Sequence, residues 1–291
     1  SHIIGQIDND NNGISGIEKS LDKKLKIIKE PLKLTVDTDL QFLIREELIK
    51  FQTIFQNIGS AAILMNVNNG NILSMISLPD FNLNKRKTIK DQNYINRASK
   101  GVYELGSVFK TFTIASGLNE EVVDTNTEFK DLPKSLECAN KPIREYDKEM
   151  PPNLTTEQIL IRSGNIGSVR IAQAVGLEKF SSFLENLGIL NTIKFDIEEV
   201  GQPIPFTWGK CKLATAAFGH GITTTPLQLA KGYSIVTNGG FDVTPTLIAR
   251  YLESKKKRIL KEGVSEKLNP ILRKVVSSKD GTANFANING Y

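Results

Sequence analysis

Residues 101–110 read GVYELGSVFK, and this short stretch decides how the whole chain is interpreted. A glycine-flanked segment leads to Ser107, two apolar residues follow, and Lys110 comes three positions after the serine. Side chains three positions apart on a helix project from the same face, so the lysine amine could reach the serine hydroxyl. The run FKTFTIASGL (109–118) has the apolar character of a buried helix, which would take the lysine out of water.

A serine and a lysine placed in this way can carry out nucleophilic chemistry. Desolvation and the positive end of the helix dipole both lower the proton affinity of a lysine at a helix N-terminus. Lys110 would then take the hydroxyl proton as Ser107 attacks a carbonyl, and the free N–H of Ser107 would stabilise the oxyanion. The spacing alone is a weak signal, because it occurs three times, at Ser20/Lys23, Ser107/Lys110 and Ser254/Lys257. Only Ser107 has apolar flanks, whereas the other two pairs lie in charged stretches that we expect to be exposed.

The composition limits the chemistry that the chain can perform. It has 291 residues, 40% hydrophobic and 24% charged, with a net charge of +5, which is ordinary for a globular protein with a sizeable core. The only histidines are His2 and His220, so a Ser-His-Asp triad or a multi-histidine metal centre has almost nothing to draw on. We therefore expect no metal, no cofactor and a base other than histidine.

Neither a membrane span nor a nucleic-acid surface is predicted. No run of about 18 apolar residues occurs, and no signal peptide opens the chain. The basic run KKKR (255–258) lacks the further basic and aromatic residues of a nucleic-acid patch, so we interpret it as a solvated hairpin and expect no nucleic-acid partner. Cys138 and Cys211 lack the spacing of a metal site, and free thiols are the default expectation, with one disulfide as the alternative.

The order of predicted elements indicates an α+β protein. In LQFLIREELIKFQTIF (40–55) the apolar residues recur at helical spacing. SAAILMNV (60–67) and ILSMISLP (72–79) flank an Asn-Gly turn and predict an antiparallel hairpin. From Thr155 onwards, glycine-punctuated helical segments follow, and strand-like sequence returns before a last helix at 265–278. We expect a sheet assembled from both ends of the chain.

A second motif, RSGN (162–165), contains the only S-x-N in the chain. A second serine hydroxyl can relay a proton to a leaving amine, and an asparagine amide can hold a substrate carbonyl. Taken alone, the favoured interpretation is that Ser163 and Gly164 end one helix while Asn165 begins the next. The combination with Ser107 changes this balance, since S-x-x-K together with a downstream S-x-N is part of a known serine-acylation signature.

The segments around both motifs resemble class B penicillin-binding proteins. NRASKGVYELGSVFKTFT (96–113) is similar to the nucleophile segment of that family, with Leu105 where many members have proline, as in the division-type branch. LTTEQILIRSGNIGSVRIA (154–172) resembles the second motif. The resemblance extends to three further segments: SAAILMNVNNGNILSMISLPDFN (60–82), AAFGHGITTTPLQLAKGYSIVTNGG (216–240) and GIEKSLDKKL (16–25).

The resemblance implies a peptidoglycan D,D-transpeptidase, which cross-links cell-wall stem peptides through a serine acyl-enzyme, in septal synthesis. Its fold would be that of the penicillin-binding proteins and serine β-lactamases, with an antiparallel sheet flanked by helices. Carried over by position, Ser107 is the acylated nucleophile, Lys110 its base and Ser163 the proton shuttle, while Asn165 hydrogen-bonds both Lys110 and the substrate backbone. The implied substrate-binding positions are Gly164, Gly219, His220 and Gly221, although His220 is better interpreted as a turn residue.

The resemblance also divides the chain and exposes one departure. Residues 1–30 would be the end of a non-catalytic pedestal or a linker, and residues 31–291 the transpeptidase domain. The third family motif, K-[ST]-G-T on an edge strand, is missing, and its nearest match is KDGT (279–282). LRKVVSSKDGTANFANINGY (272–291) resembles the segment just ahead of that motif. We therefore expect the C-terminal strands to lie outside this chain, and acylation of residues 1–291 to be weak or absent.

The implied partners are peptidoglycan stem peptides with their lipid-linked precursor, β-lactam antibiotics bound covalently at Ser107, and membrane proteins of the division complex. The implied location is the periplasmic face of the bacterial inner membrane, through an N-terminal anchor outside this chain. Two alternatives stay open: a serine β-lactamase or D,D-carboxypeptidase, which would hydrolyse its acyl-enzyme, and a non-catalytic scaffold or sensor that retains the fold.

Overall fold

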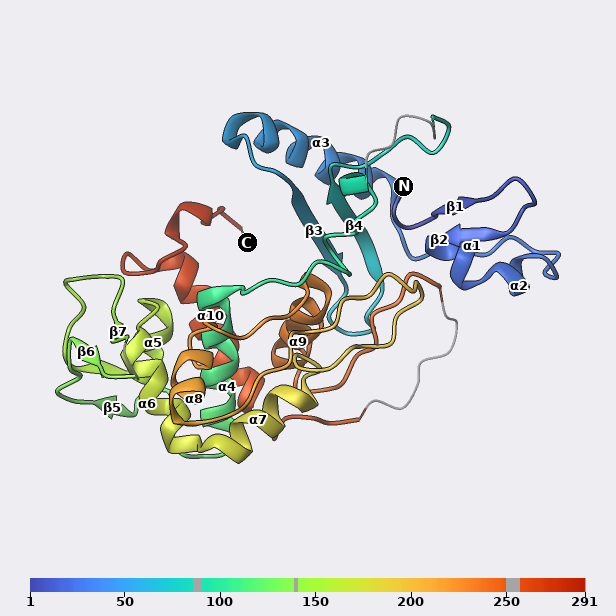
Figure 1. Ribbon diagram of the computed structural model, residues 1–291. Coiled ribbons are helices and arrows are strands. Elements are labelled where there is room, and N and C mark those ends of the chain that lie inside the picture. Colours follow the sequence, from blue (N-terminus) through green and yellow to red (C-terminus); the bar gives the residue numbers. More distant parts are fainter. Residues whose placement is uncertain (86–90, 139–140, 250–256, 291) are drawn as a thin grey trace.

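The structure is a computed structural model that describes residues 1–85, 91–138, 141–249 and 257–290. Figure 1 shows a body of helices below a long β-hairpin, with helix α3 along the hairpin and the N-terminal segment to one side. That segment contains β1 (Gln6–Ile7), β2 (Gly13–Ser15), α1 (Gly16–Ser20) and α2 (Asp22–Leu25).

Helix α3 (Thr38–Phe55) and the hairpin follow the sequence prediction closely. The carboxylate of Asp37 accepts hydrogen bonds from the N–H groups of Asp39 and Leu40, each at 3.0 Å, and so caps the helix. Strands β3 (Ser60–Met65) and β4 (Ile72–Leu78) pair antiparallel, as predicted. Segments from far along the sequence lie next to the hairpin. Asn71, just before β4, forms an isolated bridge with Thr246, and Leu34 forms one with Ile248.

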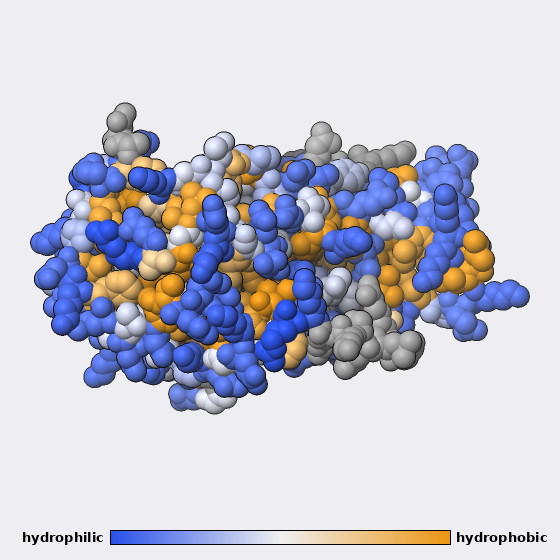
Figure 2. Space-filling model, turned by 90° about the horizontal axis from the view of Figure 1, so that it is seen from below, coloured by the Kyte–Doolittle hydropathy of each residue, from blue (hydrophilic) through white to orange (hydrophobic). Residues whose placement is uncertain are grey.

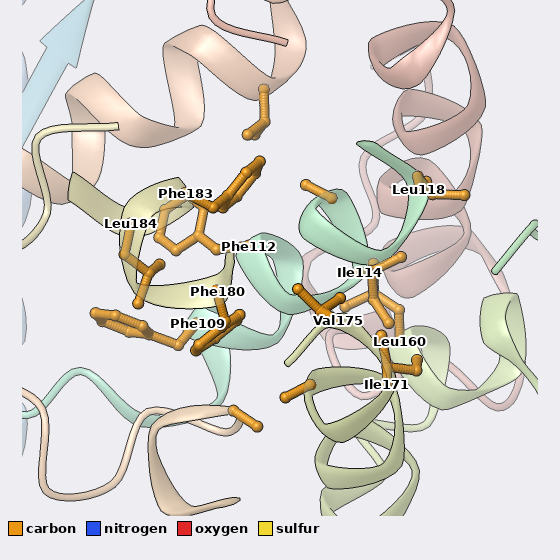
Figure 3. Close-up of a cluster of buried hydrophobic side chains, with 14 of the residues drawn as sticks. Phe109, Phe112, Ile114, Leu118, Leu160, Ile171, Val175, Phe180, Phe183 and Leu184 are labelled. Atoms are coloured by element: carbon orange, nitrogen blue, oxygen red, sulfur yellow. The ribbon is translucent and has the colours of Figure 1, made fainter. Parts of the chain in front are cut away.

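A buried helix, α4 (Lys110–Asn119), runs through the centre of the helical body. Around it lie α5 (Thr156–Ile161), α6 (Asn165–Val175), α7 (Leu177–Asn186), α8 (Lys210–Ala216), α9 (Pro226–Thr237) and α10 (Val264–Ser277). Figure 3 shows how Phe109, Phe112 and Ile114 from this part of the chain meet Ile171 and Phe180 from α6 and α7. All five side chains are fully buried, so the start of α4 is fixed in a close-packed core.

Short strands and one disulfide shape the region between α4 and α5. β5 (Glu128–Phe129) pairs with β8 (Leu154–Thr155), and β6 (Ser135–Leu136) pairs with β7 (Ile143–Arg144). Cys138, just after β6, forms a disulfide with Cys211 in α8, across a Cα–Cα distance of 5.4 Å. The expectation of free thiols is therefore wrong, and the alternative of one disulfide is correct. The described part of the chain also contains the 3₁₀ helices η2 (Asp91–Asn93), η3 (Gly106–Phe109) and η4 (Asn284–Ala286).

The surface mixes apolar and polar areas, as is usual for a folded domain. On the face shown in Figure 2, hydrophobic patches are separated by hydrophilic side chains. Within the described residues, none of the helices combines the length and the hydrophobicity that crossing a bilayer requires. Part of the KKKR run, residues 255 and 256, lies outside the described residues.

Candidate active site

Ser107 and Lys110 meet at the junction of η3 and α4. Ser107 lies in η3 and is exposed, whereas Lys110 is the first residue of α4 and its side chain is only 1% exposed. The Nζ atom of Lys110 lies 3.1 Å from the Ser107 hydroxyl. The other S-x-x-K pairs do not share this environment: the Ser20 hydroxyl accepts the N–H of Glu198, and Ser254 lies outside the described residues.

Ser163 lies against the same lysine. Lys110 Nζ is 2.7 Å from the Ser163 hydroxyl and donates to the Ser163 carbonyl at 2.5 Å. Ser163 adopts a left-handed conformation, with φ of 56°, at the end of α5. This conformation is uncommon for a residue with a Cβ, and here it turns the carbonyl and the hydroxyl of one residue towards Lys110.

Burial changes the acid–base properties of this lysine. Desolvation lowers the pKa of Lys110 to about 8, and the carboxylate of Glu145 acts in the opposite direction. At pH 7 about one lysine in ten is then neutral and able to accept a proton. A base with a pKa near the operating pH is what general base catalysis requires.

Gly164 and Asn165 lie where the second motif predicts, at the start of α6. Gly164 is the N-cap residue and Asn165 the first helical residue. The expected hydrogen bond between Asn165 and Lys110 is not found among the described residues. The Asn165 amide nitrogen instead donates to the backbone carbonyl of Arg144 at 2.8 Å. Asn165 nevertheless lines the same cavity as Ser107 and Lys110.

Gly219 and His220 lie beside the turn that carries Ser107. Gly219 has φ of +79°, and a Cβ there would lie 2.0 Å from the carbonyl oxygen of Gly106, so only glycine allows this close approach. His220 is 68% exposed and its Nδ1 lies 3.2 Å from the carboxylate of Glu104. Gly221 is not among the residues that line the cavity, and its carbonyl accepts a hydrogen bond from Lys212.

The cavity over Ser107 has a volume of about 710 Å³. Eight of its lining residues were not predicted as site residues from the sequence: Glu104, Gly106, Tyr146, Asp147, Arg162, Phe218, Asp280 and Thr282. Arg162 connects three segments that line the cavity, which are its own segment and those of Asp147 and Asp280. It forms ion pairs with Asp147 at 3.3 Å and with Asp280 at 3.2 Å. The position of Arg162 next to Ser163 was the one signal in the sequence that could have identified it.

The KDGT segment (279–282) reaches the cavity without forming a strand. Residues 278–282 form a turn after α10, and the N–H of Thr282 donates to the carbonyl of Ile161 at 3.3 Å. Asp280 and Thr282 both line the cavity. This segment therefore borders the cavity from the C-terminal side.

The chain is similar to several known proteins along its length. The chain is 31% identical to the "Probable peptidoglycan D,D-transpeptidase FtsI" of Caulobacter vibrioides, with 100% of this chain and 50% of the relative covered. It is 27% identical to the stage V sporulation protein D of Bacillus subtilis (100% and 51% covered) and 28% identical to the peptidoglycan D,D-transpeptidase FtsI of Escherichia coli K12 (82% and 45% covered). The chain thus spans about half the length of the curated relatives it matches.

Solved structures share the fold. A crystal structure from Atopobium parvulum matches with a TM-score of 0.89 at 23% identity, covering 99% of this chain and 72% of that one. The TP domain of penicillin-binding protein 3 from Burkholderia pseudomallei matches with a TM-score of 0.78 at 23% identity, covering 89% and 74%. Residues 60–291 match the family described as "Penicillin binding protein transpeptidase domain". The chain belongs to the penicillin-binding protein transpeptidase family and has its fold.

Proposed function

We propose that this chain is the transpeptidase domain of a peptidoglycan D,D-transpeptidase of the division type, and that Ser107 is its acylated nucleophile. One observation carries the proposal: the buried Nζ of Lys110 lies 3.1 Å from one serine hydroxyl and 2.7 Å from another. In this arrangement Lys110 can take a proton from the Ser107 hydroxyl and pass it on through the Ser163 hydroxyl. The names of the relatives support the substrate class and the division role.

The first half of the reaction is acylation. Neutral Lys110 takes the proton from the Ser107 hydroxyl while that oxygen attacks the carbonyl carbon of the peptide bond between the terminal D-residues of a stem peptide. The N–H of Ser107, in the first turn of η3, has no helical acceptor and is available to the oxyanion. As the carbon–nitrogen bond breaks, Ser163 relays the proton from Lys110 to the leaving amine.

The second half transfers the acyl group. The amine of a second stem peptide attacks the ester carbonyl, loses its proton through the same Ser163–Lys110 pair and releases Ser107 with its proton restored. A β-lactam would open its ring by the same attack and leave a stable ester on Ser107. Asn165, Gly219 and His220, which line the cavity, are proposed substrate contacts near the serine, together with Gly164 and Gly221, which adjoin them in the sequence.

Several wider attributes follow as part of the proposal. The substrates are stem peptides and their lipid-linked precursor, the division-complex membrane proteins are partners, and the site of action is the periplasmic face of the inner membrane. Residues 1–30 are assigned to the end of a pedestal or linker and residues 31–291 to the catalytic domain. The family match over residues 60–291 lies within the second of these ranges.

The direct test is labelling with a fluorescent penicillin. In a protein that includes the K-[ST]-G-T strand we expect a slowly released adduct that mass spectrometry maps to the peptide containing Ser107, and no adduct in Ser107→Ala. Residues 1–291 alone should label weakly or not at all. Ser20→Ala, from another S-x-x-K pair, is the matched control and should label normally. Labelling that persists in Ser107→Ala would sink the assignment. Rapid turnover of a chromogenic β-lactam would instead favour a β-lactamase, and rescue of a transpeptidase-deficient strain by Ser107→Ala would favour a scaffold.

A further inference from the structure

Glu145 makes an unusual connection to the helix that carries the second motif. One oxygen of its carboxylate accepts the N–H of Asn165 at 2.6 Å, and the other accepts the N–H of Ile166 at 2.8 Å. These are the first two N–H groups of α6, which have no acceptor within the helix. The N-cap residue, Gly164, has no side chain to supply one. A carboxylate twenty positions earlier therefore caps this helix, with its charge at the positive end of the helix dipole.

This cap acts on the residues that contact Lys110. Ser163 lies two residues before the capped N–H of Asn165, so the position of the α6 first turn sets where its hydroxyl and carbonyl lie. A neighbouring bond reinforces the connection, because the Asn165 side chain donates to the Arg144 carbonyl at 2.8 Å. Glu145 does not itself line the cavity over Ser107. Any effect of Glu145 on the reaction therefore passes through α6 or through its electric field.

The negative charge of Glu145 acts electrostatically on Lys110 and is not neutralised by an ion pair among the described residues. Among the described residues no ion pair of Glu145 is found, and its charge is the one that raises the pKa of Lys110 against the effect of burial. The cavity is lined by other titratable side chains, which are Glu104, Tyr146, Asp147, Arg162, His220 and Asp280. Asp147 and Asp280 are paired with Arg162, and Glu104 is paired with His220. From α9, the phenol of Tyr233 donates to the Val108 carbonyl at 2.9 Å.

We propose that Glu145 is a positioning residue for acylation, which holds the first turn of α6 and Ser163 against Lys110 and supplies the negative charge that faces this lysine. The inference rests on the proposed acylation of Ser107. It assigns a function to a residue in the irregular stretch between α4 and α5, outside both sequence motifs.

The test compares Glu145→Gln with Glu145→Asp, using the rate of penicillin acylation as a function of pH. Glutamine keeps one oxygen acceptor but removes the charge, so protonated Lys110 is less stabilised. We expect the midpoint of the pH profile to move to lower pH by about half a unit or more, and the plateau rate to fall about 10-fold. Aspartate keeps the charge but is shorter, so its plateau should fall while its midpoint stays within a few tenths of a unit of the parent. Glu149→Gln, on the same loop, is the matched control and should behave like the parent protein.

The outcomes separate this inference from the proposed function. A lower melting temperature with an unchanged midpoint and plateau in Glu145→Gln would mean that Glu145 is only a helix cap, and would overturn the inference. Equal midpoint shifts in the glutamine and aspartate variants would overturn it too. If Glu145→Gln does not fold, the aspartate variant alone decides, because a normal plateau there contradicts a positioning role. Failure of the parent protein that includes the K-[ST]-G-T strand to label at Ser107 would instead overturn the proposed function.

Discussion

Lys110 and Ser163 are joined at two atoms, since the lysine Nζ donates to the serine carbonyl at 2.5 Å and lies 2.7 Å from its hydroxyl. The carbonyl contact orients the amine, and the hydroxyl contact would give it a route for a proton under the proposed function. Both depend on the left-handed conformation of Ser163. The second motif thus contributes a backbone atom and a side-chain atom to the surroundings of the same lysine.

The acylation rate should depend on pH with the sign that a lysine base requires. The pKa of Lys110 is about 8, and only the neutral amine accepts the serine proton. The rate should therefore rise about tenfold per unit below this pKa and level off above it. Stopped-time labelling with fluorescent penicillin from pH 6 to 9.5 measures the profile, with spontaneous β-lactam hydrolysis subtracted at each pH. A flat profile would contradict the assignment of Lys110 as the base.

Two substitutions of Ser163 should separate its backbone strain from its hydroxyl. Ser163→Gly and Ser163→Ala both remove the hydroxyl, so acylation should fall on the order of 100-fold in each. Glycine adopts the left-handed conformation without the Cβ clash, so its unfolding free energy should exceed that of the alanine variant by up to about 1 kcal/mol. Urea unfolding of the two variants checks this difference. An alanine variant more stable than the glycine variant would be inconsistent with the left-handed turn.

Burial of Lys110 should make stability depend on pH. Its folded pKa of about 8 lies below the unfolded value of 10.5, so the folded state binds fewer protons between these values. The unfolding free energy should rise across this window by about 3 kcal/mol relative to Lys110→Met, which has no amine to titrate. Urea unfolding at pH 7.5, 9 and 10.5 compares the two proteins. A constant difference across this range would show that the lysine titrates normally.

The Cys138–Cys211 disulfide should stabilise the folded protein. It closes a loop across a sequence separation of 73 residues, so its loss should cost about 2–4 kcal/mol of unfolding free energy. Denaturant unfolding of the Cys138→Ser/Cys211→Ser double variant measures this. Dithiothreitol should destabilise the parent protein by a similar amount and leave the double variant unchanged. An equal effect on both proteins would show that reduction of the Cys138–Cys211 disulfide is not what destabilises the parent.

Local elements could be predicted because their signals are local. The helical spacing at 40–55 and the Asn-Gly hairpin both lie within a few residues of the structure they specify. The charged stretch at 16–30 was less informative. It forms two short helices, α1 and α2, which meet at Leu21.

The sequence by itself determined the family, the helices and the hairpin, and it distinguished Ser107 and Lys110 from two equivalent serine–lysine pairs by their apolar flanks. Only the tertiary structure decided that Ser163 turns two oxygens towards Lys110, that Glu145 caps α6, and that Arg162 connects three segments that line the cavity. These contacts join residues that are far apart along the chain. Their partners are selected by the packing of helices around α4, and no local pattern of residues records which distant groups that packing brings together.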